Sequence, residues 1–139
     1  MILRSVGSVT ALPLLAAILL AGCGRGQKSA RPDIDAIPEV ELRSAATKRA
    51  IYEFRAKVKK RGVAAAKQDL PDLLSSFEGY EKHNLGEHKE TYKQIVEKLN
   101  AMQAGLGSAT KESVTKAVDE LGALAAKLPG QADENPVVE

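Results

Sequence analysis

Apolar residues recur at every third or fourth position in four stretches of this chain, and that spacing restricts the fold to helices. The most regular stripe lies near the C-terminus and consists of Val114, Ala117, Val118, Leu121, Leu124, Ala125 and Leu128. The spacing puts these side chains on one face of an α-helix, where they can be buried together. β-Branched and aromatic residues do not alternate with polar ones over a useful length, so no strand is expected. The pattern predicts an all-α protein.

The other three stripes predict helices over residues 38–61, 63–82 and 84–105. The first has acidic residues in its first turn and cations near its end, which suits the helix dipole. Asn84 and Glu87 have the spacing of a capping box at the start of the third helix. Ser108 is the expected cap of the last helix, which the Pro129-Gly130 pair would end.

Pro71 lies inside the second predicted helix and leaves two interpretations open. Proline lacks a backbone donor and disfavours the helical conformation of Leu70, so the helix either kinks there or restarts with Asp69 as a cap. The apolar stripe keeps its phase on both sides of Pro71. The sequence therefore favours one kinked helix.

Three short connections, at Gly62, residues 83–86 and residues 105–108, place successive helices antiparallel. The expected architecture is a small up-and-down antiparallel helical bundle over residues 38–130. It has four helices, or three if the first two merge. Residues 131–139 carry acidic side chains and no stripe, so they are predicted to form a disordered acidic tail.

Residues 1–22 have the layout of a signal peptide. Arg4 gives the leader a positive charge, and an apolar run of about 16 residues follows from Val6 to Ala21. A membrane-spanning helix needs about 20 apolar residues, so a retained membrane anchor is the less favoured alternative. Cys23 follows this segment and is the only cysteine, so it has no disulfide partner within the chain.

The sequence Leu20-Ala21-Gly22-Cys23 closely resembles the lipobox of bacterial lipoproteins. The resemblance covers the signal segment alone. It implies diacylglycerol transfer to the sulfur of Cys23, cleavage between Gly22 and Cys23 by the lipoprotein signal peptidase, and acylation of the new amino terminus. Two or three acyl chains give stable membrane anchoring. By the same resemblance, Gly24 in place of an aspartate favours the outer membrane if the source has two membranes.

Residues 23–37 are polar, contain glycine and proline, and show no sustained periodicity. They are predicted to form a flexible tether between the lipidated cysteine and the helical body. A random coil of this length reaches about 20 Å on average. Such a tether would lift the body away from the lipid headgroups.

Few residues of the helical body suggest chemistry, and neither an enzyme activity nor a cofactor is expected. His83 and His88 lie five residues apart near three glutamates, and they could hold a divalent metal only if the intervening turn brought them together. Met102 could pair with a histidine at a haem, but the chain has no Cys-x-x-Cys-His motif, and methionine at core spacing usually serves packing. No nucleophile motif or phosphate-binding loop is found.

The densest charge feature is the stretch from residue 43 to residue 61, where eight cations accompany a single acidic residue, Glu53. The cations are Arg43, Lys48, Arg49, Arg55, Lys57, Lys59, Lys60 and Arg61. They form either a solvated helix face or a contact surface for anionic lipid, a cell-wall polymer or an acidic partner. The formal net charge of +2 gives no global attraction to nucleic acid.

One known class of small helical lipoproteins is bonded to peptidoglycan through a C-terminal lysine. This chain ends Val137-Val138-Glu139, so that function is not carried over. The expected function is that of a non-enzymatic envelope lipoprotein, a tethered helical bundle that acts by contact with a protein partner or an envelope polymer. The alternative is a metal- or ligand-binding bundle that uses His83 and His88 with nearby carboxylates.

Overall fold

The computed structural model describes residues 38–139 and shows four α-helices in that part of the chain. They are α1 (Glu39–Arg61), α2 (Val63–Ser75), α3 (Lys89–Gly105) and α4 (Lys111–Ala126). Short 3₁₀ helices lie at Tyr80–Lys82, Gly86–His88 and Leu106–Ser108, and the described residues contain no strand. The predicted all-α bundle is confirmed. No helix within residues 38–139 combines the length and the apolar character needed to cross a membrane.

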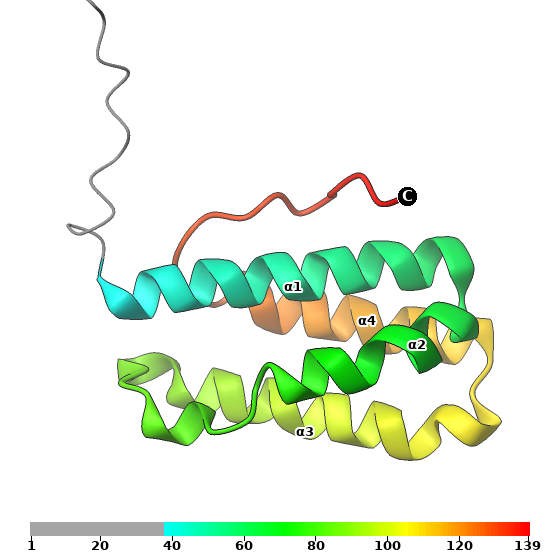
Figure 1. Ribbon diagram of the computed structural model, residues 1–139, viewed down its shortest axis with the longest axis horizontal. Coiled ribbons are helices and arrows are strands. Elements are labelled where there is room, and N and C mark those ends of the chain that lie inside the picture. The colour runs from blue at the N-terminus through cyan, green and yellow to red at the C-terminus, as the bar shows by residue number, and fades with distance from the viewer. Residues whose placement is uncertain (1–37) are drawn as a thin grey trace, which may run out of the picture. The chain divides into compact units, whose positions relative to one another are not determined.

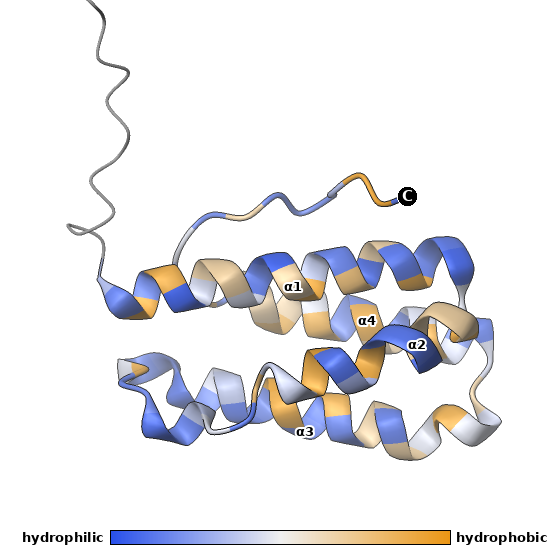
Figure 2. Cartoon of the chain, viewed as in Figure 1, coloured by the Kyte–Doolittle hydropathy of each residue, from blue (hydrophilic) through white to orange (hydrophobic). Residues whose placement is uncertain are grey.

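The four helices run alternately up and down, and each packs mainly against two others (Figure 1). α1 contacts α2 and α4, and α3 contacts the same two helices. Hydrophobic residues lie mainly on the sides of the helices that face one another (Figure 2). The completely buried side chains come from all four helices and include Ile51, Val58, Leu70, Ile95, Leu99, Val118 and Leu121. The apolar stripes therefore meet in one shared core.

Gly62 separates α1 from α2, so the first two helices do not merge. Its backbone φ is +67°, a conformation that glycine adopts without the steric cost other residues incur, and its N–H donates to the Val58 carbonyl at 2.7 Å. α1 keeps its predicted bounds, with Glu39 and Glu41 in the first turn and cations in the last. Gly62, residues 76–88 and residues 106–110 connect the four helices, so only the first connection has the predicted bounds.

The second helix is shorter than predicted, because it ends at Ser75 rather than at residue 82. The helix is continuous through Pro71, so it does not restart there. The Pro71 side chain is exposed. Just after its end, the Ser76 hydroxyl donates to the Leu73 carbonyl at 2.6 Å, and Gly79 takes a left-handed conformation with φ +73°. The Ser76 hydrogen bond and the left-handed turn at Gly79 end the helix, although the apolar stripe of the sequence continues beyond Ser75.

Both predicted helix caps are wrong. Residues 86–88 form a 3₁₀ turn, so α3 begins at Lys89, with no side chain capping it. α4 is capped by Thr110 instead of Ser108, which belongs to the preceding 3₁₀ turn. The Ser113 N–H donates to Thr110 Oγ1 at 3.1 Å, and the Thr110 N–H donates to Ser113 Oγ at 2.9 Å. Thr110 has the extended backbone that a capping residue needs.

Candidate functional site

The eight cations that the sequence placed on the first helix each contact an oxygen of the chain itself. Two of them, Arg43 and Arg49, pair with a glutamate four residues away on α1, both at 2.8 Å. Three reach across to α2 or α4. These contacts are Lys57 with Asp69 at 3.4 Å, Lys59 with Asp119 at 2.6 Å, and Arg61 with Gln68 at 2.8 Å.

The remaining three cations, Lys48, Arg55 and Lys60, bind residues 130–139, here called the C-terminal segment. Lys48 Nζ donates to the Gly130 carbonyl at 2.8 Å, and Lys60 Nζ donates to the Val138 carbonyl at 2.9 Å. Between them, Arg55 Nη2 donates to the Glu134 carbonyl at 3.3 Å. The segment runs along α1 in the same direction as the helix (Figure 1). It has no regular secondary structure, and three of its backbone carbonyls accept hydrogen bonds from α1.

The acceptors in this contact are mainly backbone carbonyls, so α1 holds the segment as an irregular peptide. The Glu134 carboxylate adds a more distant ionic contact with Arg55 at 4.0 Å. Asp133 and Glu139 contribute further negative charge, and no cation lies between residues 131 and 139. A strip of cations facing an acidic peptide is thus one candidate binding site of the protein.

Arg55 is largely buried, with its side chain only 14% exposed. Its guanidinium lies 5.5 Å from the centre of the Tyr52 ring, within range of a cation–π contact. Gly122 of α4 makes room for it, since a Cβ at that position would lie 2.5 Å from Arg55 Nη1. Burial raises the pKa of Tyr52, the charge of Glu134 raises it further, and Arg55 opposes the shift.

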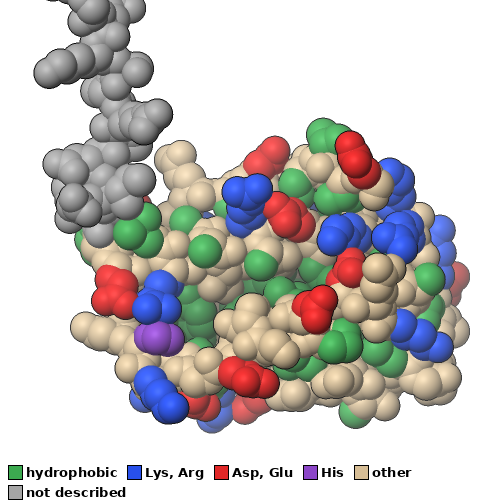
Figure 3. All heavy atoms as spheres, in the orientation of Figure 1, with side chains coloured by type: hydrophobic (Ala, Val, Ile, Leu, Met, Phe, Trp, Pro, Cys, Tyr) green, Lys and Arg blue, Asp and Glu red, His purple; other side chains and the backbone are tan. Residues whose placement is uncertain are grey.

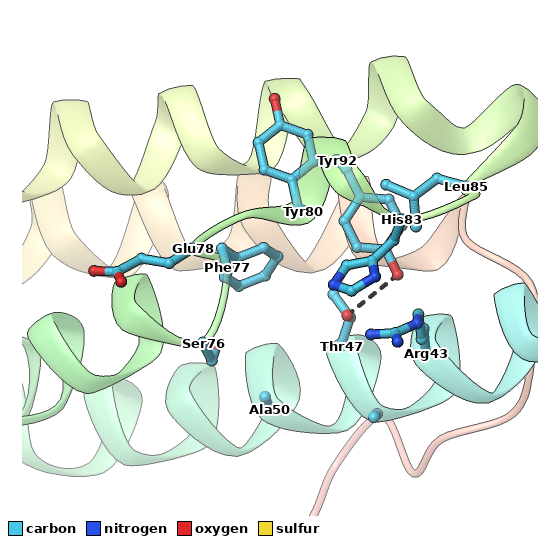
Figure 4. A pocket seen from close by; sticks show the side chains of 11 residues that line it. Arg43, Thr47, Ala50, Ser76, Phe77, Glu78, Tyr80, His83, Leu85 and Tyr92 are labelled. Carbon is cyan, nitrogen blue, oxygen red and sulfur yellow. Dashed lines mark hydrogen bonds between the residues drawn. The ribbon is translucent and has the colours of Figure 1, made fainter.

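A second feature is a cavity of about 230 Å³ between α1, residues 76–85 and the start of α3 (Figure 4). It is lined by Arg43, Ala46, Thr47, Ala50, Ser76, Phe77, Glu78, Tyr80, His83, Leu85 and Tyr92. In the space-filling view, hydrophobic side chains line a hollow beside a histidine (Figure 3). The cavity combines hydroxyl and cationic groups with apolar walls, the composition typical of small-ligand sites.

No family model matches the chain. No curated protein and no solved structure matches it either.

The structure does not gather the predicted metal candidates into one cluster. His83 lines the cavity, whereas Nε2 of His88 lies 3.6 Å from the carboxylate of Glu87. Within residues 38–139, no three His, Cys, Asp or Glu side chains are grouped so that they could hold a metal ion. Met102 is buried in the hydrophobic core. The predicted lipidation site, Cys23, and the adjacent Gly22 lie outside the described residues.

Gly130 fixes the point at which the C-terminal segment turns back along α1. Its φ is +81°, and an added Cβ would lie 2.8 Å from the Glu41 carbonyl oxygen and 2.9 Å from Ala45 Cβ. Gly130→Ala is therefore expected to cost at least about 1–2 kcal/mol in the free energy of unfolding, because the left-handed backbone alone costs that much. Urea unfolding of the chain from residue 24 onward measures the change.

Gly107→Ala is the matched control, because its φ is not in the left-handed region and an added Cβ has no neighbour within 4 Å. It should leave the unfolding midpoint almost unchanged. Equal midpoints for Gly130→Ala and the unaltered chain would contradict the close approach of residue 130 to α1.

Proposed function

We propose that this protein is a lipid-anchored envelope protein with no enzymatic activity, and that it acts by binding an acidic, extended segment of a partner protein. The binding surface is the strip formed by Lys48, Arg55 and Lys60 on α1. The observation that supports this assignment is the C-terminal segment itself, which occupies the strip through hydrogen bonds to its backbone. A surface that accepts this peptide within one chain has the chemistry to accept a similar peptide from another.

The contact with the C-terminal segment is weak enough to be exchanged. Hydrogen bonds on a protein surface contribute about 0.5–1.5 kcal/mol each, and exposed ion pairs contribute about 0–1 kcal/mol. Val137 is 99% exposed, so the segment gains little from apolar burial near its end. A partner with a longer acidic stretch would displace the segment by forming the same bonds together with additional ones.

The anchor expected at Cys23 would raise the effectiveness of such a weak surface. α1 begins at Glu39, sixteen residues after that cysteine. A connection of this length would keep the strip within a few nanometres of the membrane, where tethering raises the effective concentration of a membrane-associated partner to the millimolar range. Millimolar concentrations suffice for a surface whose individual contacts are worth only about 1 kcal/mol each.

The test uses the chain from residue 24 truncated after Pro129 and a fluorescent peptide with the sequence of residues 130–139, which carries all three acceptors. The truncated protein should bind this peptide measurably, and the full-length chain should bind it at least about fivefold more weakly, because its own segment occupies the strip. A peptide with its three carboxylate side chains converted to amides should also bind more weakly. Fluorescence anisotropy at low salt measures all three affinities.

Two triple variants of the truncated protein separate the strip from general charge. Replacing Lys48, Arg55 and Lys60 with glutamine should abolish peptide binding. Replacing Lys57, Lys59 and Arg61 removes the same charge from the same helix but no contact with the segment, so binding should persist. Equal losses of peptide affinity in the two variants would show that binding depends on the general charge of α1 and not on the strip. Binding of the truncated protein to isolated cell-wall polymer but not to the peptide would indicate that the partner is a polymer and not a protein.

A further inference from the structure

The cavity beside α1 has a polar end and an apolar end. Figure 4 shows the guanidinium of Arg43, the ring of His83 and the hydroxyl groups of Thr47 and Tyr92 gathered at one end. The carboxylate of Glu78, which also lines the cavity, points away from this group (Figure 4). The polar end therefore presents a positive charge and several hydrogen-bond donors, a combination that suits an anionic group.

The hydroxyl groups at this end are held in place from within the core. Tyr92 is only 3% exposed, and its hydroxyl oxygen lies 3.2 Å from both Ser44 Oγ and Thr47 Oγ1. Ser44 is completely buried. Ser44, Thr47 and Tyr92 together carry three O–H protons. The two contacts use two of these protons, so one O–H remains to donate to another acceptor. Thr47 is the half-buried member that lines the cavity, and it can present this donor to a ligand.

Arg43 keeps donors for a second acceptor although it already pairs with a carboxylate. Its Nε–H donates to Glu39 Oε1 at 2.8 Å, and this bond uses only one of the five guanidinium N–H groups. The two terminal NH₂ groups form the fork that binds both oxygens of a carboxylate. The pair with Glu39 also holds the side chain at the mouth of the cavity. Arg43 is thus positioned before a ligand arrives.

The apolar part of the cavity gathers most of the aromatic residues in the chain. The protein has three tyrosines and two phenylalanines, and Phe77, Tyr80 and Tyr92 line this one site. The rings of Phe77 and Tyr80 lie 6.4 Å and 6.3 Å from that of Tyr92. A volume of about 230 Å³ limits the occupant. In other proteins a cavity of about 150 Å³ holds benzene, so this one accommodates a single ring and a short polar group.

From this arrangement we infer that the cavity is a binding site for a small monocarboxylate that carries one aromatic ring. The carboxylate binds Arg43 and the Thr47 hydroxyl, and the ring lies among Phe77, Leu85 and Tyr92. A single arginine matches the single charge of a carboxylate better than the double charge of a phosphate. The lining residues differ from those that bind the C-terminal segment, so this inference is independent of the proposed function.

Phenylacetate is the probe, and its uncharged analogue phenylacetamide is the comparison. Titrated into the unlipidated chain of residues 24–139, which contains the whole helical core, phenylacetate should shift the NMR amide signals of Thr47, Phe77 and Tyr92. A dissociation constant on the order of 0.1–1 mM is expected for a ligand of this size. Phenylacetamide should bind at least about tenfold more weakly, since it lacks the charge that pairs with the guanidinium.

Two arginine variants on the same helix provide a matched pair. Arg43 and Arg49 each form a 2.8 Å bond to a glutamate four residues away, but only Arg43 lines the cavity. Arg43→Gln should weaken phenylacetate binding at least about tenfold, whereas Arg49→Gln should leave the affinity unchanged. Thr47→Val should also weaken binding, and it tests the hydroxyl without removing the buried Tyr92.

Several outcomes would overturn the inference. Shifts confined to residues outside the cavity, or none up to about 10 mM phenylacetate, would mean that the cavity does not take this ligand. Equal affinity for phenylacetate and phenylacetamide would show that the carboxylate charge does not contribute to binding. Equal losses in the two arginine variants would show general attraction to a basic surface. Tighter binding of phenyl phosphate than of phenylacetate would assign the site to phosphate esters instead.

Discussion

Leu121→Ala should lower the free energy of unfolding by about 2–5 kcal/mol, a large share of the roughly 5–15 kcal/mol available to a domain. Leu121 lies in the middle of the α4 stripe and is 0% exposed, so truncation removes apolar contacts and leaves a cavity. Surrounding helices refill such a cavity only partly, because they are held by their own packing. Thermal and urea unfolding of the chain from residue 24 onward, followed by circular dichroism, measures the loss.

Leu42→Ala is the control for this substitution. Leu42 lies on α1 and is 39% exposed, so the same change of residue type removes less buried surface than at Leu121 and leaves no enclosed cavity. The unfolding free energy should change by no more than about 0.5 kcal/mol. If Leu121→Ala left the melting curve as unchanged as Leu42→Ala does, the α4 stripe would be a docking surface rather than part of a closed core.

The helices could be predicted from the sequence because their signals are local. A stripe such as that of α4 repeats over sixteen residues, and its buried members Val114, Val118 and Leu121 occupy the face that the spacing predicts. The end of α1 was equally readable, since Gly62 and the cations before it are adjacent in the chain. The spacing of apolar residues predicts which face of a helix is buried without showing which helix covers that face.

Helix caps were harder to predict, because neighbouring residues compete for the same role. Ser108 and Thr110 are both suitable caps by residue type, and the choice depends on which of them has extended backbone. The 3₁₀ turn at Leu106–Ser108 takes Ser108 out of the competition. Asn84 is likewise not the cap of α3, because a 3₁₀ turn at residues 86–88 separates it from the helix.

The contacts that define the two candidate binding features could not be predicted, because they join residues that are distant in sequence. Lys48 contacts Gly130 across 82 positions, and Ser44 contacts Tyr92 across 48. Neither pair has a local pattern. The one available signal was charge, because a strongly basic stretch and an acidic C-terminus in the same chain attract each other. Only the antiparallel packing of α1 against α4 determines that the C-terminal segment starts beside the basic helix.

Cys23→Ser should abolish fatty-acid incorporation completely and leave the precursor uncleaved. The prediction follows from the lipobox resemblance of residues 20–23, in which the thiol is the acceptor of the diacylglycerol. A thiolate is a strong nucleophile near neutral pH, and a serine hydroxyl is not, although the two side chains are similar in size. Metabolic labelling with a radioactive fatty acid in a bacterial host, followed by gel electrophoresis of the immunoprecipitated protein, measures both lipid and cleavage.

Gly24→Ser is the control, since it introduces the same residue one position later and keeps the cysteine. It should be labelled and processed as the unaltered precursor is. The apolar run from Val6 to Ala21 remains on the uncleaved Cys23→Ser precursor, so membrane association alone does not report lipid, whereas the fatty-acid label does. Persistent label on Cys23→Ser would show that lipid is attached elsewhere. Complete loss of label with normal labelling of Gly24→Ser would place the lipid on the cysteine sixteen residues before α1, which is the attachment expected to strengthen the proposed partner binding.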